Sequence, residues 1–220
     1  MTKSRLNQTI KESLRRPGPF RNQRKSILIA LEDERSARLY FESIKKLLRS
    51  ERVIVIAEHA GSAPKSVVNA AKRANEKREK DAEHGLEDSF DEVWVVFDTE
   101  GPQNRQRQLA ARSAIDQAHQ LKFKTAVSNP AFEFWLLLHF EWTVQMIKDD
   151  DAACRLLRLH IKGYRKNTNP FESTWEHVGT AIERAKRIFK ERFSNTSEHP
   201  CDCHPCTEVY RLVEALRAEI

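Results

Sequence analysis

Carboxylate side chains follow two apolar stretches of this sequence. Residues 93–97 are Val-Trp-Val-Val-Phe, and Asp98 and Glu100 come shortly after them. Residues 26–31, Ser-Ile-Leu-Ile-Ala-Leu, lead in the same way into Glu32. Residues two apart on an extended segment point to the same side, so the carboxylates of Asp98 and Glu100 can converge on one point. If the two stretches are parallel strands of one sheet, the three acids meet at its carboxyl edge, where α/β folds bind ligands.

Three carboxylates in one place repel one another unless a cation offsets their charge. Mg²⁺, or Mn²⁺ in its place, suits such a site because it takes carboxylates, waters and substrate phosphates as ligands. A bound Mg²⁺ polarises a phosphodiester and lowers the pKa of a bound water, which phosphodiester hydrolysis requires. The alternative is that these acids are solvated or cap the helices that follow them.

The elements that would position these acids alternate between strands and helices up to residue 140. After the first expected strand, apolar residues recur at helical spacing, and we expect Ser36 to cap the helix that they form. Strand–helix alternation predicts an α/β fold, a mostly parallel sheet flanked by helices. The expected strands are 26–31, 53–57, 93–97 and 123–128, and the expected helices are 36–48, 65–83 and 105–120, the last with three arginines, Arg105, Arg107 and Arg112.

Residues 128–140 predict a buried helix that carries one more acid, Glu133. Asn129 is a candidate N-cap and Pro130 a first-turn proline, and the segment is apolar nearly all round. A buried carboxylate needs a partner. Glu133 could share a face with Asn129 at the same sheet edge as Asp98 and help to position a metal there. Alternatively, its partner is the start of its own helix.

The predicted organisation has three parts. Residues 1–25 hold eight basic residues against one acid and predict a flexible arm that either binds phosphates or only aids solubility. Residues 26–140 form the α/β domain, and residues 141–220 a helical extension packed on it. We expect no strand after Glu141, and helices at 143–160, 173–193 and 207–219, the last capped by Thr207.

Composition favours a folded protein with a polyanionic partner. Hydrophobic residues make up 40% of the 220, and the net charge is +6 with a pI near 9.2. Such a balance suits RNA or DNA without proving it, because basic residues interleaved with acids also form solvated surfaces. No apolar run reaches the roughly 18–20 residues that span a bilayer, and no signal-type segment occurs near the N-terminus. We therefore expect a cytoplasmic protein without a membrane partner.

A cluster of cysteines and histidines near the C-terminus is a candidate zinc site. Cys203 and Cys206 have the spacing of a zinc-ligand pair, and Cys201 and His204 could complete a set of four. Structural zinc sites usually join two separated pairs, and no second pair occurs elsewhere. The alternative, which we favour, is that these are reduced cysteines in a loop.

The sequence resembles the RloB-like family, whose sheet domain is similar to the Toprim domain of topoisomerases, primases and overcoming-lysogenization-defect nucleases. The most distinctive block is 128–140, Ser-Asn-Pro-Ala-Phe-Glu-Phe-Trp-Leu-Leu-Leu-His-Phe. Further blocks are 27–36 with Tyr40-Phe41, and 93–100. A weaker similarity extends from 195 to 216, so the resemblance covers most of residues 26–216.

The resemblance implies a Mg²⁺-dependent nuclease. Glu32 matches the Toprim glutamate, a general acid/base or metal ligand, while Asp98 and Glu100 match the Asp-x-Asp metal pair. The family context implies anti-phage defence beside restriction systems, with foreign DNA or a host RNA such as tRNA as substrate, and a possible protein partner from the defence system.

The sequence departs from the family pattern at three positions. Glu100 stands where aspartate is usual, Asp33 where glycine commonly follows the glutamate, and Ala37 where another acid is expected. Two alternatives to a nuclease remain, and Asp33 and Ala37 are indications of the first. One is a non-catalytic subunit that binds nucleic acid or nucleotide, and the other is an adaptor within a defence complex.

Overall fold

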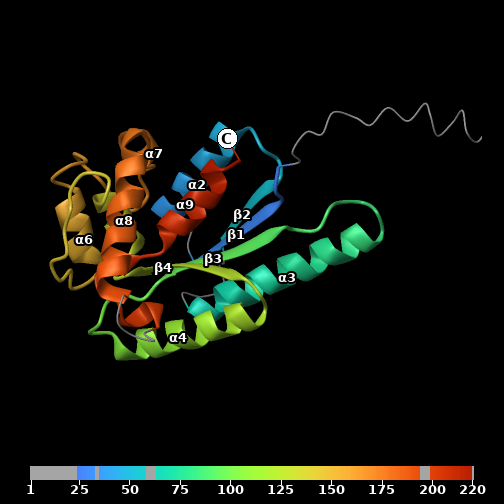
Figure 1. Cartoon of the computed structure of the whole chain (residues 1–220), viewed down its shortest axis with the longest axis horizontal. Helices are drawn as coiled ribbons and strands as arrows, with labels where there is room; N and C mark the ends of the chain where they lie inside the picture. Colours follow the sequence, from blue (N-terminus) through green and yellow to red (C-terminus); the bar gives the residue numbers. More distant parts are fainter. Residues whose placement is uncertain (1–23, 33–34, 58–62, 194–198, 220) are drawn as a thin grey trace, which may run out of the picture.

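A five-stranded sheet forms the centre of the fold in the computed structural model, which describes residues 24–32, 35–57, 63–193 and 199–219 (Figure 1). The strand order is β2-β1-β3-β4-β5. The first four strands are parallel, and β5 runs antiparallel to β4. Their bounds are β1 Ile27–Leu31, β2 Val53–Ala57, β3 Glu92–Asp98, β4 Lys124–Asn129 and β5 Cys206–Thr207.

Helices cover both faces of the sheet. Figure 1 shows α3 (Pro64–Glu83) and α4 (Arg105–Gln120) below the sheet, and α2 (Ser36–Leu48) and α9 (Val209–Arg217) above it. The apolar residues of β1 and β3 alternate between two cores, one under each helix layer. Strands buried on both faces are continuous apolar runs rather than alternating ones, which explains the two stretches in the sequence. The predicted α/β class is confirmed.

The C-terminal part of the chain shares the upper core. It contains α6 (Asp150–Leu157), α7 (Phe171–Thr174), the 3-10 turn η1 (Trp175–His177) and α8 (Val178–Phe193), and then η2 (Pro200–Asp202) leads to β5 and α9. Apolar residues of α6, α8 and α9 pack in one cluster with those of β1 and α2. The C-terminal extension therefore packs on the upper face of the sheet.

Several predicted bounds in this part are wrong. The strand β5 was not expected, because two residues have no periodicity and become a strand only by pairing with Ser128 and Asn129. Within the predicted helix 143–160, only α6 is helical, and 173–193 is divided among α7, η1 and α8. The last helix begins at Val209, with Glu208 rather than Thr207 at its N-cap.

The predicted starts of two other helices are also corrected. Arg35 is the N-cap of α2, and Ser36 is its first helical residue, whose hydroxyl donates to Glu133 (3.3 Å) instead of capping the helix. Asn129 is the last residue of β4 and is followed by a cis peptide to Pro130. The buried helix, α5 (Phe132–Leu137), therefore begins two residues beyond the proline.

The basic arm predicted at 1–25 falls mostly outside the described residues, which begin at 24. Its last two residues are attached to the body of the protein. Arg24 donates to the carbonyl of Leu48 (2.6 Å), and the ammonium of Lys25 pairs with Glu92 (2.7 Å). Across the part of the chain that the structure describes, no helix combines the length and the apolar character needed to cross a membrane.

Candidate functional site

The parallel pairing of β1 with β3 places Glu32 beside Asp98. The register pairs Leu31 with Val96, and the backbone N–H of Glu32 donates to the Val96 carbonyl (3.2 Å). The backbone N–H of Asp98 in turn donates to Glu32 Oε2 (3.3 Å). The two acids that end the apolar stretches therefore lie next to each other at the carboxyl edge of the sheet, as parallel strands require.

Glu100 reaches this edge by a turn rather than by strand alternation. The strand β3 ends at Asp98, and Glu100 has a left-handed φ of 60°, followed by Gly101 with φ of 85°. Backbone hydrogen bonds from Thr99 to Ser128 (3.0 Å) and from Glu100 to Pro130 (2.9 Å) fix the turn. The expectation that Asp98 and Glu100 lie two apart on one extended segment is therefore wrong, although Glu100 still faces the site.

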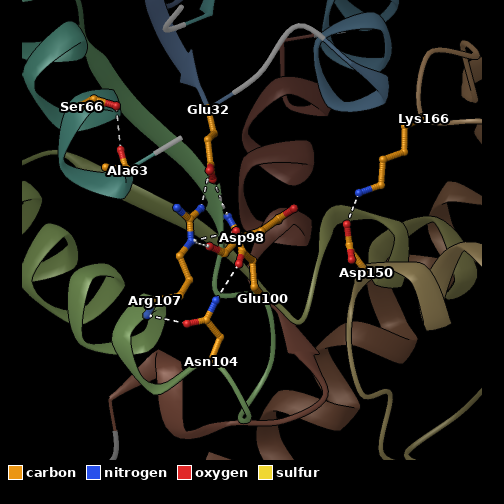
Figure 2. A network of polar contacts seen from close by, with 9 residues as sticks. All are labelled: Glu32, Ala63, Ser66, Asp98, Glu100, Asn104, Arg107, Asp150 and Lys166. Atoms are coloured by element: carbon orange, nitrogen blue, oxygen red, sulfur yellow. Dashed lines mark hydrogen bonds and ion pairs between the residues drawn. The ribbon is translucent and has the colours of Figure 1, made fainter. Parts of the chain in front are cut away.

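Arg107 lies among these acids, and its guanidinium is the centre of the network in Figure 2. It forms an ion pair with Glu32, donates through Nε to the Asp98 carbonyl oxygen (3.1 Å), and has Nε 3.5 Å from Glu100 Oε1. Only 8% of its side chain is exposed. One buried cation thus links the ends of β1 and β3 to the turn after β3.

The start of α4 places Arg107 in this position. Asn104 is the N-cap, and its side-chain oxygen accepts from the Arg107 backbone N–H (3.0 Å), while its amide donates to Glu100 Oε2 (2.8 Å). From the sequence, Arg107 was expected only as one of three arginines of this helix. The spacing of Asn104 and Arg107 was the available indication, because it places the arginine in the first turn, close to the preceding strand.

Burial is the main influence on the charge of Glu32. It raises the pKa of the carboxyl above its usual value, and the charge and hydrogen bond of Arg107 only partly offset this effect. Glu32 consequently binds a proton more readily than an exposed glutamate does. A raised pKa makes a carboxyl better suited to the role of a general acid or base.

The chemistry of these side chains suits a divalent metal, but their arrangement includes a competitor. Carboxylate oxygens are the ligands that Mg²⁺ prefers, and Glu32 and Glu100 both reach the same small region around the Arg107 guanidinium. Among the residues that the structure describes, however, no three His, Cys, Asp or Glu side chains are arranged to hold a metal. The positive charge among these acids is that of Arg107.

Glu133 has a separate set of partners. It lies in the first turn of α5 with only 3% of its surface exposed, and it accepts from the hydroxyls of Tyr164 (3.0 Å) and Ser36 (3.3 Å). The Asn129 side chain points elsewhere and donates to the carbonyls of Cys201 and Cys203. The expected common face of Asn129 and Glu133 is therefore not formed, because the helix begins later than predicted.

Three of the candidate zinc ligands, Cys201, Cys203 and Cys206, are buried and His204 is half-buried, and within the described residues they form no group that could hold a metal. Cys201 packs in the core below the sheet, whereas Cys203 and Cys206 pack in the core above it. His204 Nδ1 is hydrogen-bonded to Asn129 Oδ1 (2.8 Å). Burial raises the pKa of the Cys201 thiol to about 12, so this cysteine is a neutral thiol at physiological pH.

Comparison with known proteins gives a family assignment that covers the sheet and both helix layers. The model of a family described as RloB-like protein matches residues 27–216, from the first residue of β1 to the last turn of α9. The chain belongs to the RloB-like family. Neither curated proteins nor solved structures gave a match. In this RloB-like protein, the matched region includes Glu32, Asp98, Glu100 and Arg107.

Proposed function

We propose that this RloB-like protein is a Mg²⁺- or Mn²⁺-dependent nuclease that hydrolyses phosphodiester bonds of RNA or DNA in anti-phage defence. The observation that carries the proposal is the meeting of Glu32, Asp98 and Glu100 at the carboxyl edge of a parallel sheet. The resemblance of the same three residues to the Toprim metal site supports it, as does the net charge of +6.

Each acid has a role that its position supports. Asp98 and Glu100 would hold the metal, which when bound polarises the phosphodiester and activates a water. Glu32 would serve as a ligand or as the general acid/base, and its raised pKa favours proton exchange. Glu133 would act indirectly, because it holds Ser36 at the start of α2, the helix that follows Glu32 in the chain.

The substrate would be held by basic residues. The arm at 1–25 and basic residues of α8 such as Lys186, Arg187 and Lys190 can follow a phosphate backbone, which makes binding dependent on salt. Foreign DNA and a host RNA such as tRNA fit this chemistry equally. A second protein of the defence system could also be required for activity in the cytoplasm.

The test compares the wild-type protein with Asp98→Ala on plasmid DNA, single-stranded DNA and tRNA, with Mg²⁺ or Mn²⁺ and with a chelator. We expect metal-dependent cleavage by the wild type, abolished by the chelator, and at least about 100-fold less cleavage by the variant, which loses a metal ligand. Asp88→Ala is the matched control, because Asp88 is exposed, pairs with Arg52 (2.9 Å) and lies outside the site. Equal cleavage by Asp98→Ala and the wild type would contradict the proposal.

A non-catalytic binding subunit is the second candidate. The ion pair of Glu32 with Arg107 favours it, because the charge of Glu32 is already balanced without a metal, and so do the departures at Asp33 and Ala37. The Asp98→Ala variant of such a subunit would bind nucleic acid as well as the wild type does, and neither protein would cut it. An adaptor within a defence complex would bind neither metal nor nucleic acid.

A further inference from the structure

The position of Arg107 has a consequence for metal binding. Its guanidinium touches the carboxylates of Glu32 and Glu100, two of the groups assigned to the metal in the proposed function, and also the backbone carbonyl of Asp98. The Glu32 side chain is 16% exposed and that of Arg107 is 8% exposed, so water screens their attraction weakly. A divalent ion that enters this edge therefore meets carboxylates that already have a cationic partner.

Arg107 and a metal cannot both have full use of the same oxygens. A guanidinium donates hydrogen bonds to carboxylate lone pairs, and a metal needs those lone pairs for coordination. The two cations also repel each other at short range. Metal binding is therefore opposed by the loss of the Glu32–Arg107 ion pair and by the charge of the arginine.

We propose that Arg107 is an internal counter-ion that competes with the divalent metal for Glu32 and Glu100, and so lowers the metal affinity of the site. This inference rests on the proposed function, because it assumes that a metal binds there. Without metal, Arg107 offsets the repulsion among the acids and keeps the edge folded. With metal, its guanidinium releases the carboxylates.

A purely structural role for Arg107 predicts the opposite result. The residue also links α4 to the end of β3 through the Asp98 carbonyl, so it could hold the acids in the geometry that a metal needs. If so, its removal would loosen the site and weaken metal binding. The sign of the change in affinity therefore separates competition from support.

The experiment titrates the full-length protein with Mn²⁺ by isothermal calorimetry, comparing the wild type with Arg107→Gln and Arg107→Lys. Gln removes the charge, and we expect about tenfold tighter binding, because one positive charge within a few ångströms of the ion is gone. Lys keeps the charge, so its affinity should stay within about threefold of the wild type. Arg112→Gln is the matched control, because Arg112 lies on the same helix and pairs with Asp202; its affinity should equal that of the wild type.

A second measurement does not depend on whether the Arg107→Gln variant folds. In the wild type, the ¹⁵N–¹H signal of Arg107 Nε should shift on addition of Mg²⁺, because Glu100 Oε1, which lies 3.5 Å from Nε, turns to the metal, while the Nε signal of Arg112 stays in place. The Arg107→Lys protein, which lacks the signal, assigns it. A signal that does not move when the wild type is saturated with metal would overturn the inference.

The possible results test the role of Arg107 separately from the proposed function. Tighter binding by Arg107→Gln supports competition. Equal or weaker binding by Arg107→Gln, with metal-dependent cleavage by the wild type, overturns the role of Arg107 and leaves the nuclease intact. If the wild type binds no metal at all, the proposed function and this inference both fail.

Discussion

Glu133 and His139 show how single polar side chains are accommodated in the most apolar segment of the chain. Glu133 has two hydroxyl donors from elements distant in sequence, Ser36 and Tyr164. His139 has nearby acceptors: its Nδ1–H points to the carbonyls of Trp135 (3.0 Å) and Leu136 (3.2 Å). Its ring also packs edge-on against Trp135. The carboxylate is held by distant donors, whereas only one nitrogen of the His139 imidazole is satisfied by its own turn of chain, and Nε2 is buried without a hydrogen-bond partner among the described residues.

His139 should make the protein less stable in mild acid. Burial lowers the pKa of the imidazole to about 4, from the ordinary value of 6.5 that it regains on unfolding. Because the unfolded chain takes up this proton first, stability is lost as the pH falls from about 6.5 towards 4. Between pH 7.5 and pH 5, we expect the free energy of unfolding of the wild type to fall by about 2 kcal/mol more than that of His139→Gln.

Urea unfolding at the two pH values measures this difference. His84→Gln is the control for the substitution itself, since His84 is exposed at the end of α3. The same loss of stability in His139→Gln and in the wild type would show that His139 is not its source.

At the scale of elements, the turn after β3 connects the site to the C-terminal part of the chain. Gly101 has φ of 85°, and a Cβ added to it would overlap the backbone oxygen of Lys148, which lies just before α6. The position therefore needs glycine for two reasons, its backbone conformation and the close approach of another segment. The neighbouring Glu100 depends on this turn to face Arg107.

Gly101→Ala should be more harmful than an alanine at another glycine with a positive φ. We expect a loss of about 2–4 kcal/mol in the free energy of unfolding, from the strained φ and the clash together. Gly85→Ala separates the two contributions, because Gly85 has φ of 69° but no atom within 4 Å of an added Cβ. It should lose only about 1 kcal/mol. Equal losses in the two variants, measured by urea unfolding, would show that the approach of Lys148 costs nothing.

The elements of residues 26–120 were predicted well from the sequence, and the later ones poorly. Their strands are apolar runs and their helices have regular spacing, so local pattern and tertiary structure agree. Around Asn129, the pattern of a helix start was present, but the chain instead continues β4 by one residue and turns at Pro130. The pairing of β4 with β5 decides in favour of the strand. The two residues of β5 carry no sequence pattern from which this pairing could be predicted.

On the scale of the whole molecule, the predicted α/β domain and its extension share one core. Apolar residues from Ile27 to Leu216 pack together above the sheet, and α9 contributes Val209, Leu212, Val213 and Leu216 to that cluster. The segment also supplies β5, which pairs with β4. The boundary drawn at residue 140 therefore divides the sequence but not the core.

A chain that ends at residue 140 should not fold on its own. It would expose to water the apolar surface that α6, α8 and α9 cover above the sheet, and it would leave Glu133 without Tyr164. This loss is comparable with the roughly 5–15 kcal/mol that stabilises a typical domain. We expect no cooperative thermal transition by circular dichroism. A chain that begins at residue 24 and keeps the rest is the control, and it should unfold cooperatively. A cooperative transition in the shorter protein would establish residues 26–140 as an independent domain.

The sequence by itself determined the α/β class, most elements up to residue 120, and the edge at which Glu32 and Asp98 meet. These follow from local apolar patterns and from the fact that parallel strands end on the same side. Only the tertiary structure decided that Arg107 lies among the acids, that Glu100 arrives by a left-handed turn, and that residues 206–207 complete the sheet. Each depends on partners distant in the chain, such as Arg107 and Glu32, which are 75 positions apart. A pattern in sequence records what a segment buries, but not which distant side chain will neutralise its charge.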